Sequence, residues 1–390
     1  MEVSVYLDHN ATTPVHPAAA EAVAEALRSQ FGNASSVHAY GQAAKAALDE
    51  ARGSVAALVG GEPSEIVFTS GGTEADNLAL RGVAETAPAD RRHLIASAIE
   101  HEAVLHTCKA LAARGWQTTL LPVGAGGVVD PAALERALTP ETALVSVMHA
   151  NNEIGTLQPI ADLARIAHAR GVRVHVDAVQ SAGKVPLAAR ALGIDLLSIS
   201  GHKFNGPKGA GALWVRRGTR VSATMTGGRQ ERNRRAGTEN VPAIVGLGVA
   251  ARVAREQLEA TAAGCRALRD RLEAGILEGV PGTVVNGAPD ARVPNTTSIS
   301  FDGVEAEALL IALDLEGIAV STGSACSSGT LEPSHVLRAM GFPPRRVQSS
   351  IRFSVGLGNT EAEIDRVLAV LPGTVARLRT LAGSGTGIRA

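Results

Sequence analysis

The sequence predicts an α/β fold with two domains: a large domain on a mixed, mostly parallel sheet and a smaller α+β domain. A chain of 390 residues is long enough for two domains of ordinary size. Short β-branched runs alternate with helical patterns from about residue 60 to 215, which is typical of a parallel sheet. The last third of the chain mixes strand-like and helix-like segments without that alternation.

The large sheet is expected to use the β-branched runs of the first region. These are EIVFTS (65–70), HLIASAIE (93–100), TALVSVMHA (142–150), VRVHVDA (172–178), DLLSIS (195–200) and GALWV (211–215). One long helical pattern spans about 241–277, after which strands are expected at 296–302, 317–323 and 350–356 and helices at 305–317 and 361–379. We place the large domain at 15–255 and the small domain at 1–14 and 256–390.

Composition excludes several classes of function. The formal net charge is -1, so no overall field attracts nucleic acid or an anionic membrane. No window resembles a membrane span and the amino terminus does not resemble a signal peptide, so a cytoplasmic protein is expected. The three scattered cysteines cannot form a fully paired disulfide framework and offer no CxxC metal knuckle, and no metal is expected.

Ligands of open α/β sheets bind at the carboxyl ends of the strands, so the residues at and just after these ends are the first candidates for a binding site. Ser70, Gly71, Gly72 and Thr73 follow the first strand and precede a helical run. Bare N–H groups at a helix N-terminus favour an anion, in particular a phosphate. A plain helix cap, with Thr73 as the N-cap residue, is the structural alternative.

Three further strand ends carry reactive side chains. His101 ends one strand and opens a helix, where it is either a packing residue or a group that stacks on an aromatic ligand or moves a proton. Asp177 and Lys203 lie at the carboxyl ends of consecutive strands, 26 residues apart, with Gln180 three residues after Asp177 and with Ser200 and His202 just before Lys203. A pyridoxal phosphate site needs an acid for its ring nitrogen and a lysine for a Schiff base. The alternative for Asp177 and Lys203 is an ordinary salt bridge.

Cys326 differs from the other two cysteines in its surroundings. It lies in STGSACSSGTLEPSHVL, a run of small residues that favours an accessible nucleophile over a core position. Cys108 and Cys265 lie in helical patterns and are expected to be packing residues.

Two other patterns are interpreted as structural. Gly246, Gly248 and Ala251 match a dinucleotide fingerprint but lie inside a helical pattern with no preceding strand. The arginines between 229 and 235 are most simply a solvated loop, with a partner contact as the alternative.

Together these residues resemble the pyridoxal-phosphate cysteine desulfurases of the nitrogen-fixation and iron–sulfur assembly type, which have the aspartate aminotransferase-like fold. The shared motifs run through nearly the whole chain in the expected order. They are YLDHNATTPV, FGNASSVH, EIVFTSGGTEADN, EHEAVL, MHANNEIGT, HVDAVQSAGK, SGHKFNGPKG, RRAGTEN, TGSACSS, LEPSHVLRAM and SSIRFS.

The resemblance implies a pyridoxal 5'-phosphate cofactor and a role for each matching residue. Lys203 resembles the Schiff-base lysine, Asp177 the partner of the pyridine nitrogen, His101 the stacked imidazole, and Gln180 the residue that meets the phenolic oxygen. The residues implied for the phosphate are Gly72, Thr73, Ser200 and His202, with Thr238 reaching across from the second subunit of a homodimer. Asn33, Asn152 and Arg352 resemble the residues around the substrate, Asn152 also meeting the cofactor, and Arg352 would pair with the substrate carboxylate.

The implied reaction converts L-cysteine to L-alanine and leaves a persulfide on Cys326, for delivery to an iron–sulfur scaffold or another sulfur acceptor. Catalysis would fall to Lys203, His101 and Cys326. A selenocysteine lyase or a transaminase of the same fold is the alternative, and so is a non-catalytic sulfur-relay protein. Neither the lyase nor the transaminase needs a nucleophile on a loop of small residues, so Cys326 is the residue that discriminates.

Overall fold

The computed structural model describes residues 5–323 and 333–384, and for residue 384 it describes the backbone only. Its largest sheet has seven strands in the order β2-β8-β7-β6-β5-β3-β4. The strands are β2 (Ile66–Thr69), β3 (His93–Ser97), β4 (Gln117–Leu121), β5 (Thr142–Ser146), β6 (Arg173–Asp177), β7 (Leu196–Ser200) and β8 (Gly211–Val215). Only β8 runs in the direction opposite to the other strands of this sheet, which confirms the predicted mixed, mostly parallel arrangement.

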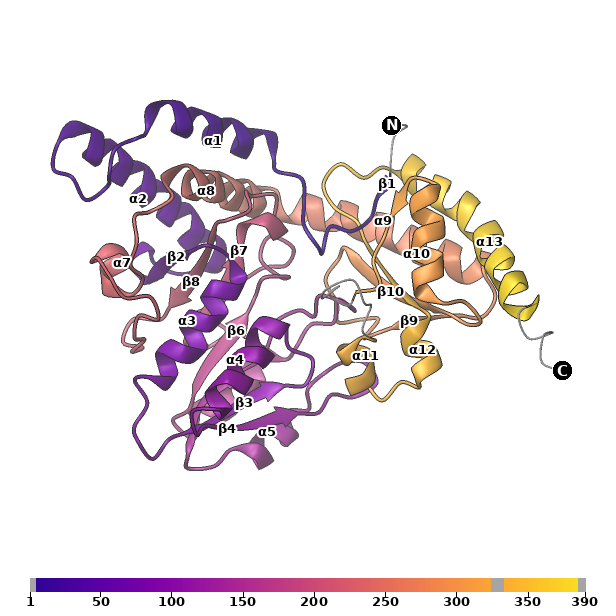
Figure 1. Cartoon of the computed structure of the whole chain (residues 1–390), viewed down its shortest axis with the longest axis horizontal. Coiled ribbons are helices and arrows are strands. Elements are labelled where there is room, and N and C mark those ends of the chain that lie inside the picture. Colours follow the sequence, from indigo (N-terminus) through magenta and orange to yellow (C-terminus); the bar gives the residue numbers. More distant parts are fainter. Residues whose placement is uncertain (1–4, 324–332, 385–390) are drawn as a thin grey trace.

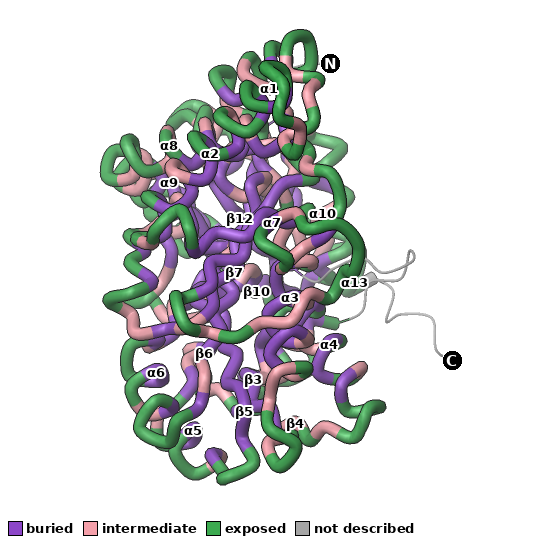
Figure 2. The backbone as a smooth tube through the Cα atoms, turned by 90° about the vertical axis from the view of Figure 1, so that its left-hand side faces the viewer, coloured by how far each residue is buried: buried purple, intermediate pink, exposed green. Residues whose placement is uncertain are grey.

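Helices cover both faces of this sheet because its strands are apolar on both faces. Side chains alternate along a strand, so Ile66 and Phe68 of β2 join one buried cluster and Val67 joins the other. The first cluster is completed by α2 (Ala39–Val59), α5 (Pro131–Ala137), α6 (Ile160–His168) and α8 (Val241–Glu256), and the second by α3 (Gly72–Ala84) and α4 (Glu102–Ala112). Figure 2 shows the buried backbone along the central strands, with exposed segments around it.

A second, smaller assembly lies beside the large sheet (Figure 1). An antiparallel sheet joins β12 (Ser350–Ser354), β10 (Thr296–Phe301) and β9 (Thr283–Asn286), and β1 (Val5–Tyr6) pairs in parallel with β11 (Ile318–Ala319). The helices here are α9 (Leu258–Gly279), α10 (Ala306–Leu315), α11 (His335–Ala339), α12 (Pro344–Gln348) and α13 (Glu361–Ser384). A separate apolar cluster lies among β1, β10, β12, α9, α10 and α13. The domain boundaries at residues 15 and 255 stay a prediction.

Three local expectations were wrong. The helical pattern over 241–277 forms two helices, α8 and α9, because the backbone leaves helical geometry at Gln257 (φ -101°, ψ 7°). The strand that begins at His93 ends at Ser97, so His101 does not end it. The basic segment 229–235 is only partly solvated: Arg235 pairs with Glu74 at 2.8 Å, and four-residue α7 (Gln230–Asn233) contains a buried glutamate.

The two cysteines expected in the core are there. Cys108 on α4 is 3% exposed and Cys265 on α9 is 8% exposed. Burial raises the pKa of both thiols, that of Cys108 to about 12, so neither is a thiolate at neutral pH. Within the described residues, no helix combines the length and apolar character needed to cross a membrane, and no group of three or more histidine, cysteine or acidic side chains is placed to hold a metal ion.

Candidate active site

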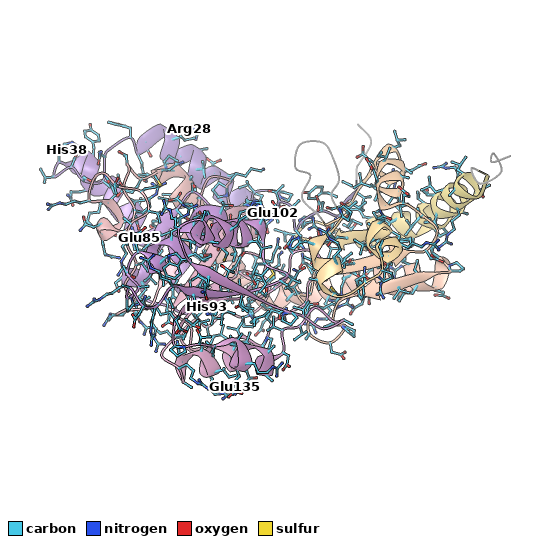
Figure 3. The ribbon with its side chains drawn as sticks, turned by 60° about the horizontal axis from the view of Figure 1, so that its bottom comes forward. Arg28, His38, Glu85, His93, Glu102 and Glu135 are labelled. Carbon is cyan, nitrogen blue, oxygen red and sulfur yellow. The ribbon has the colours of Figure 1, made fainter. Side chains whose placement is uncertain are left out.

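A cavity of about 790 Å³ opens at the carboxyl ends of the parallel strands. It brings together residues from both predicted domains, including Arg352 on β12. The lining contains these residues singled out in the sequence: Gly72, Thr73, His101, Asn152, Asp177, Gln180, Ser200, His202, Lys203 and Arg352. Figure 3 shows Glu102, another lining residue, on the side of the large domain that faces the small one.

Three of the predicted residues are not part of this lining. Asn33 and Thr238 are exposed and lie elsewhere on the chain, where the Asn33 carboxamide oxygen accepts a hydrogen bond from the Ser35 N–H at 2.9 Å. Cys326 lies outside the described residues. Their predicted roles therefore stay predictions.

The N-terminus of α3 forms one wall of the cavity. The helix begins at Gly72 with Gly71 as its N-cap residue, and no side chain caps it. Thr73 is therefore a residue of the first turn, and its interpretation as the N-cap residue was wrong. Ser200 is close by, because a Cβ atom added to Gly71 would lie 3.7 Å from Oγ of Ser200. The first-turn N–H groups and the helix dipole make this end of the cavity suitable for an anion.

Asp177 is the last residue of β6, and His101 is the N-cap residue of α4. Asp177 is 5% exposed and one carboxylate oxygen accepts a hydrogen bond from the Val179 N–H at 2.9 Å. Burial raises the pKa of Asp177, and the nearby His101 and Lys203 oppose that rise. Nδ1 of His101 accepts from the Ala103 N–H at 3.1 Å, which leaves Nε2 as the nitrogen that carries a proton.

Lys203 follows β7 in a short 3-10 turn, Gly201–Lys203. Its Nζ donates to the main-chain oxygens of Asn10 at 2.6 Å and Ala11 at 2.8 Å. Burial, and then the positive charge of Arg352, lower the pKa of Lys203 to about 8, although Asp177 acts in the opposite direction. The amine is thus neutral far more often at physiological pH than that of an exposed lysine.

Arg352 extends from the middle of β12 into the cavity. It is 4% exposed, and it donates to the Asp8 carboxylate at 2.6 Å and to the main-chain oxygen of Asn152 at 2.9 Å. Nε of Arg352 is buried with no acceptor in the described part of the chain. Since a guanidinium has five N–H donors, donors remain for a carboxylate ligand.

Sequence reasoning missed the contribution of the N-terminal segment to this site. Asn10 and Ala11 line the cavity, and their carbonyl oxygens hold Lys203 although about 190 residues separate them in the chain. The motif YLDHNATTPV contains both residues and was the only signal that pointed to them. No spacing or periodicity in the sequence indicates so distant a contact.

The segment that follows residue 332 was also missed. Pro333, His335 and Arg338 line the cavity. Ser334 donates to the buried Glu153 at 2.5 Å, and Nε2 of His335 hydrogen-bonds the main-chain oxygen of Glu100 at 3.0 Å. These contacts fix the start of α11 against the large sheet.

A half-buried lysine with a lowered pKa, a buried aspartate and a helix N-terminus without a side-chain cap share one cavity at the carboxyl ends of a mostly parallel sheet. This arrangement defines an enzyme of the aspartate aminotransferase-like fold. The family model Aminotransferase class-V matches residues 5–367. The chain belongs to this family, whose members depend on pyridoxal 5'-phosphate, and within it to the cysteine desulfurases.

Curated relatives and solved structures agree on this branch. A cysteine desulfurase of Gluconacetobacter diazotrophicus is 51% identical over 380 residues, which cover 97% of this chain and 95% of the relative. The cysteine desulfurase IscS of Methanosarcina thermophila is 47% identical over 378 residues, 97% of this chain and 93% of the relative. A solved NifS-like protein superposes with a TM-score of 0.91 at 39% identity, covering 96% of this chain and all of the other. The structure of SspA in complex with cysteine has a TM-score of 0.81 at 34% identity and covers 90% and 99% of the two chains.

Proposed function

We propose that this enzyme converts L-cysteine to L-alanine with pyridoxal 5'-phosphate held in the 790 Å³ cavity, and that the sulfur leaves as a persulfide of Cys326. The observation that carries the proposal is the position of Lys203: its amine, with a pKa lowered to about 8, shares the cavity with the buried carboxylate of Asp177. A cofactor that reacts with an amine and needs an acid at its ring nitrogen requires this pair.

The lining of the cavity fits the cofactor. The uncapped N-terminus of α3 suits a phosphate, with the hydroxyl of Ser200 and the imidazole of His202 in the same lining. Gly72 has no spare room, because a Cβ atom there would come within 2.7 Å of Cγ2 of Val179. When bound, pyridoxal phosphate supplies an electron-accepting ring that weakens the bonds to the substrate Cα.

The chain's own groups then hold the substrate and move its protons. Nζ of Lys203 is neutral in about one molecule in eleven at pH 7 if its pKa is about 8, so it is available as a base for the Cα proton. With the cofactor bound, the Asp177 carboxylate would keep the ring nitrogen protonated, and the His101 imidazole in the same cavity would supply a proton donor or acceptor to the substrate. The free N–H groups of Arg352, with Asn152 beside it, bind the substrate carboxylate.

Sulfur transfer requires the thiolate of Cys326 as nucleophile. Its sulfur attacks the substrate sulfur, an S–S bond forms and the substrate Cβ–S bond breaks. The electron pair of that bond stays with the carbon, which takes up a proton and leaves as part of alanine. One cysteine and one protein thiol thus become one alanine and one protein persulfide.

The proposed assembly is a homodimer. The end of the large domain that is remote from the small domain exposes Leu27, Phe31, Val37 and Tyr40, with the rings of Phe31 and Tyr40 4.9 Å apart. Figure 3 labels His38 in the same region. An apolar surface of this kind favours burial against a second copy. In that dimer the exposed Asn33 and Thr238 would serve the partner's cavity, and the sulfur acceptor would be a cytoplasmic protein such as an iron–sulfur scaffold.

Purified enzyme supplied with L-cysteine tests the proposal. We expect alanine in an amount equal to the sulfur released, and a visible absorbance band of bound cofactor that borohydride removes. Lys203→Ala should lose the band and the alanine together, whereas the matched variant Lys208→Ala, at an exposed lysine of the same segment, should keep both. Alanine formation by Lys203→Ala would refute the assignment. Alanine formed by Cys326→Ser at the wild-type rate would favour a lyase over a desulfurase.

A further inference from the structure

Lys184 lies beside the cavity without lining it. It follows Gln180 by four residues in the turns after β6, and Gly183, with φ 72°, turns the chain between them. Nζ of Lys184 donates to Oε1 of Gln180 at 2.8 Å and to Oδ1 of Asn10 at 3.0 Å. The described part of the chain gives this lysine no ion-pair partner within 4.0 Å.

These contacts determine which way the Gln180 carboxamide points. Its Nε2 donates to the main-chain oxygen of Asn10 at 2.9 Å, while its Oε1 accepts from Lys184. A flipped amide would place two acceptors against each other at Asn10, and it would also place two donors against each other at Lys184 whenever that amine is protonated. The amine of Lys184 donates in either protonation state, and neither oxygen can donate to it. One orientation therefore satisfies both neighbours.

Lys184 also hydrogen-bonds the side chain of Asn10, whose main-chain oxygen accepts the hydrogen bond from Lys203. Oδ1 of Asn10 accepts from Lys184 and from Asn295 at 3.0 Å each, and the Asn10 amide donates to Thr296 at 2.8 Å. The main-chain oxygen of Asn10 accepts from both Gln180 and Lys203. Asn10 is thus the common neighbour of the two lysines and the glutamine.

We propose that Lys184 is a positioning residue: it fixes the Gln180 amide so that the remaining N–H of Nε2 is offered to an ionised oxygen on the bound cofactor ring. This inference rests on the proposed function, since Gln180 lines the cavity in which the cofactor is placed. Lys184 has no contact with the cofactor or the substrate in this arrangement and acts only through Gln180.

Among the described residues, the electrostatic surroundings of Lys184 provide no counter-charge for its ammonium group, so its role is to position neighbouring groups and not to form an ion pair. Burial, followed by the positive charges of Lys203 and Arg352, lowers the pKa of Lys184 to about 7. The other titratable groups that face it are the thiol of Cys265 and the imidazole of His9, which share a small cavity of about 40 Å³ with it. Neither supplies a counter-charge at neutral pH, so the ammonium has no structural ion pair there.

A double-mutant cycle tests the inference with two readouts other than activity. The first is the dissociation constant of pyridoxal phosphate for the apoenzyme, and the second is the pH midpoint of the visible band of the loaded enzyme. Lys184→Met should weaken cofactor binding about tenfold and raise the pH midpoint, because the ring oxygen loses a hydrogen-bond donor and holds its neighbouring proton more tightly. The matched variant Lys109→Met, at an exposed lysine of α4, should change neither.

The double variant distinguishes an effect of Lys184 that is exerted through Gln180 from an effect that is independent of Gln180. If Lys184 acts through Gln180, Lys184→Met combined with Gln180→Ala should match Gln180→Ala alone in both readouts. Additive effects, or a Lys184→Met variant with wild-type readouts, would overturn the inference. Wild-type readouts for Gln180→Ala would instead refute the proposed role of Gln180. Lys184→Gln, which is also uncharged and keeps a polar group, provides the same readouts if the methionine variant does not fold.

Discussion

Replacing Arg352 with glutamine should raise the pKa of Lys203. Burial is the largest cause of the fall in that pKa from 10.5 to about 8, and the charge of Arg352 is the second. Arg352 lowers this pKa less than burial does, and Asp177 and Asp8 oppose both, so we expect its loss to raise the pKa by roughly one pH unit, or about 1.4 kcal/mol. At pH 7 the neutral fraction of Lys203 would fall about tenfold, from about one in eleven to about one in a hundred.

Competitive acylation of the apoenzyme measures this pKa. Trace acetic anhydride is applied from pH 6 to 10 with a free alkylamine as internal standard, and mass spectrometry quantifies the peptide that contains Lys203. The wild type should show a midpoint near 8 and Arg352→Gln a midpoint nearer 9. Arg338→Gln, which removes an exposed arginine of the same lining, is the control and should leave the midpoint in place. A wild-type midpoint at the ordinary value of lysine, or no change in Arg352→Gln, would refute the electrostatic reasoning.

Three other substitutions test the stability of the fold and the binding of the cofactor at the N-terminus of α3. Glu231→Gln removes the partner of Arg52 in a buried pair of 2.7 Å, so urea denaturation should show a loss of about 3–5 kcal/mol, and a loss below 1 kcal/mol would contradict this. Burial raises the pKa of Glu100 from 4.5 to about 8. Between these two pH values the folded state therefore binds one more proton than the unfolded state. The resulting stabilisation is complete below pH 4.5 and is lost as the pH rises toward 8. Glu100→Gln should remove that decline, and an unchanged pH profile of unfolding would show that Glu100 does not cause it. Gly72→Ala forces a Cβ atom against Val179 and should weaken cofactor binding about tenfold at nearly unchanged thermal stability, which an unaltered dissociation constant would disprove.

The sheet was predictable because its strands carry a local signal. Buried β-branched runs separated by helical patterns predicted β2, β3, β5, β6, β7 and β8. The edge strand β4 was missed because its residues, QTTLL, are mostly exposed or half-buried and lack an apolar run. The break at Gln257 was missed because the hydrophobic pattern continues through it on both sides.

The site was predictable only where a chemical group follows a strand. Asp177 and Lys203 were identified because Asp177 ends β6 and Lys203 follows β7, and the carboxyl ends of these two strands meet at one edge of the sheet. Asp8 and Asn10 were not assigned roles, since their partners Arg352 and Lys203 are distant in the chain and only the fold brings them together. Lys184 was part of a recognised motif, but its hydrogen bonds to Gln180 and Asn10 could not be predicted from the motif.

The masses of the cysteine-containing peptides after one turnover show where the substrate sulfur goes. The enzyme is mixed with one equivalent of L-cysteine, its thiols are alkylated, and each cysteine peptide is weighed. We predict one additional sulfur on the peptide that contains Cys326, with Cys108 and Cys265 unmodified because both are buried with raised thiol pKa values. A persulfide mainly on Cys108 or Cys265, or alanine formed with no protein persulfide, would contradict the account.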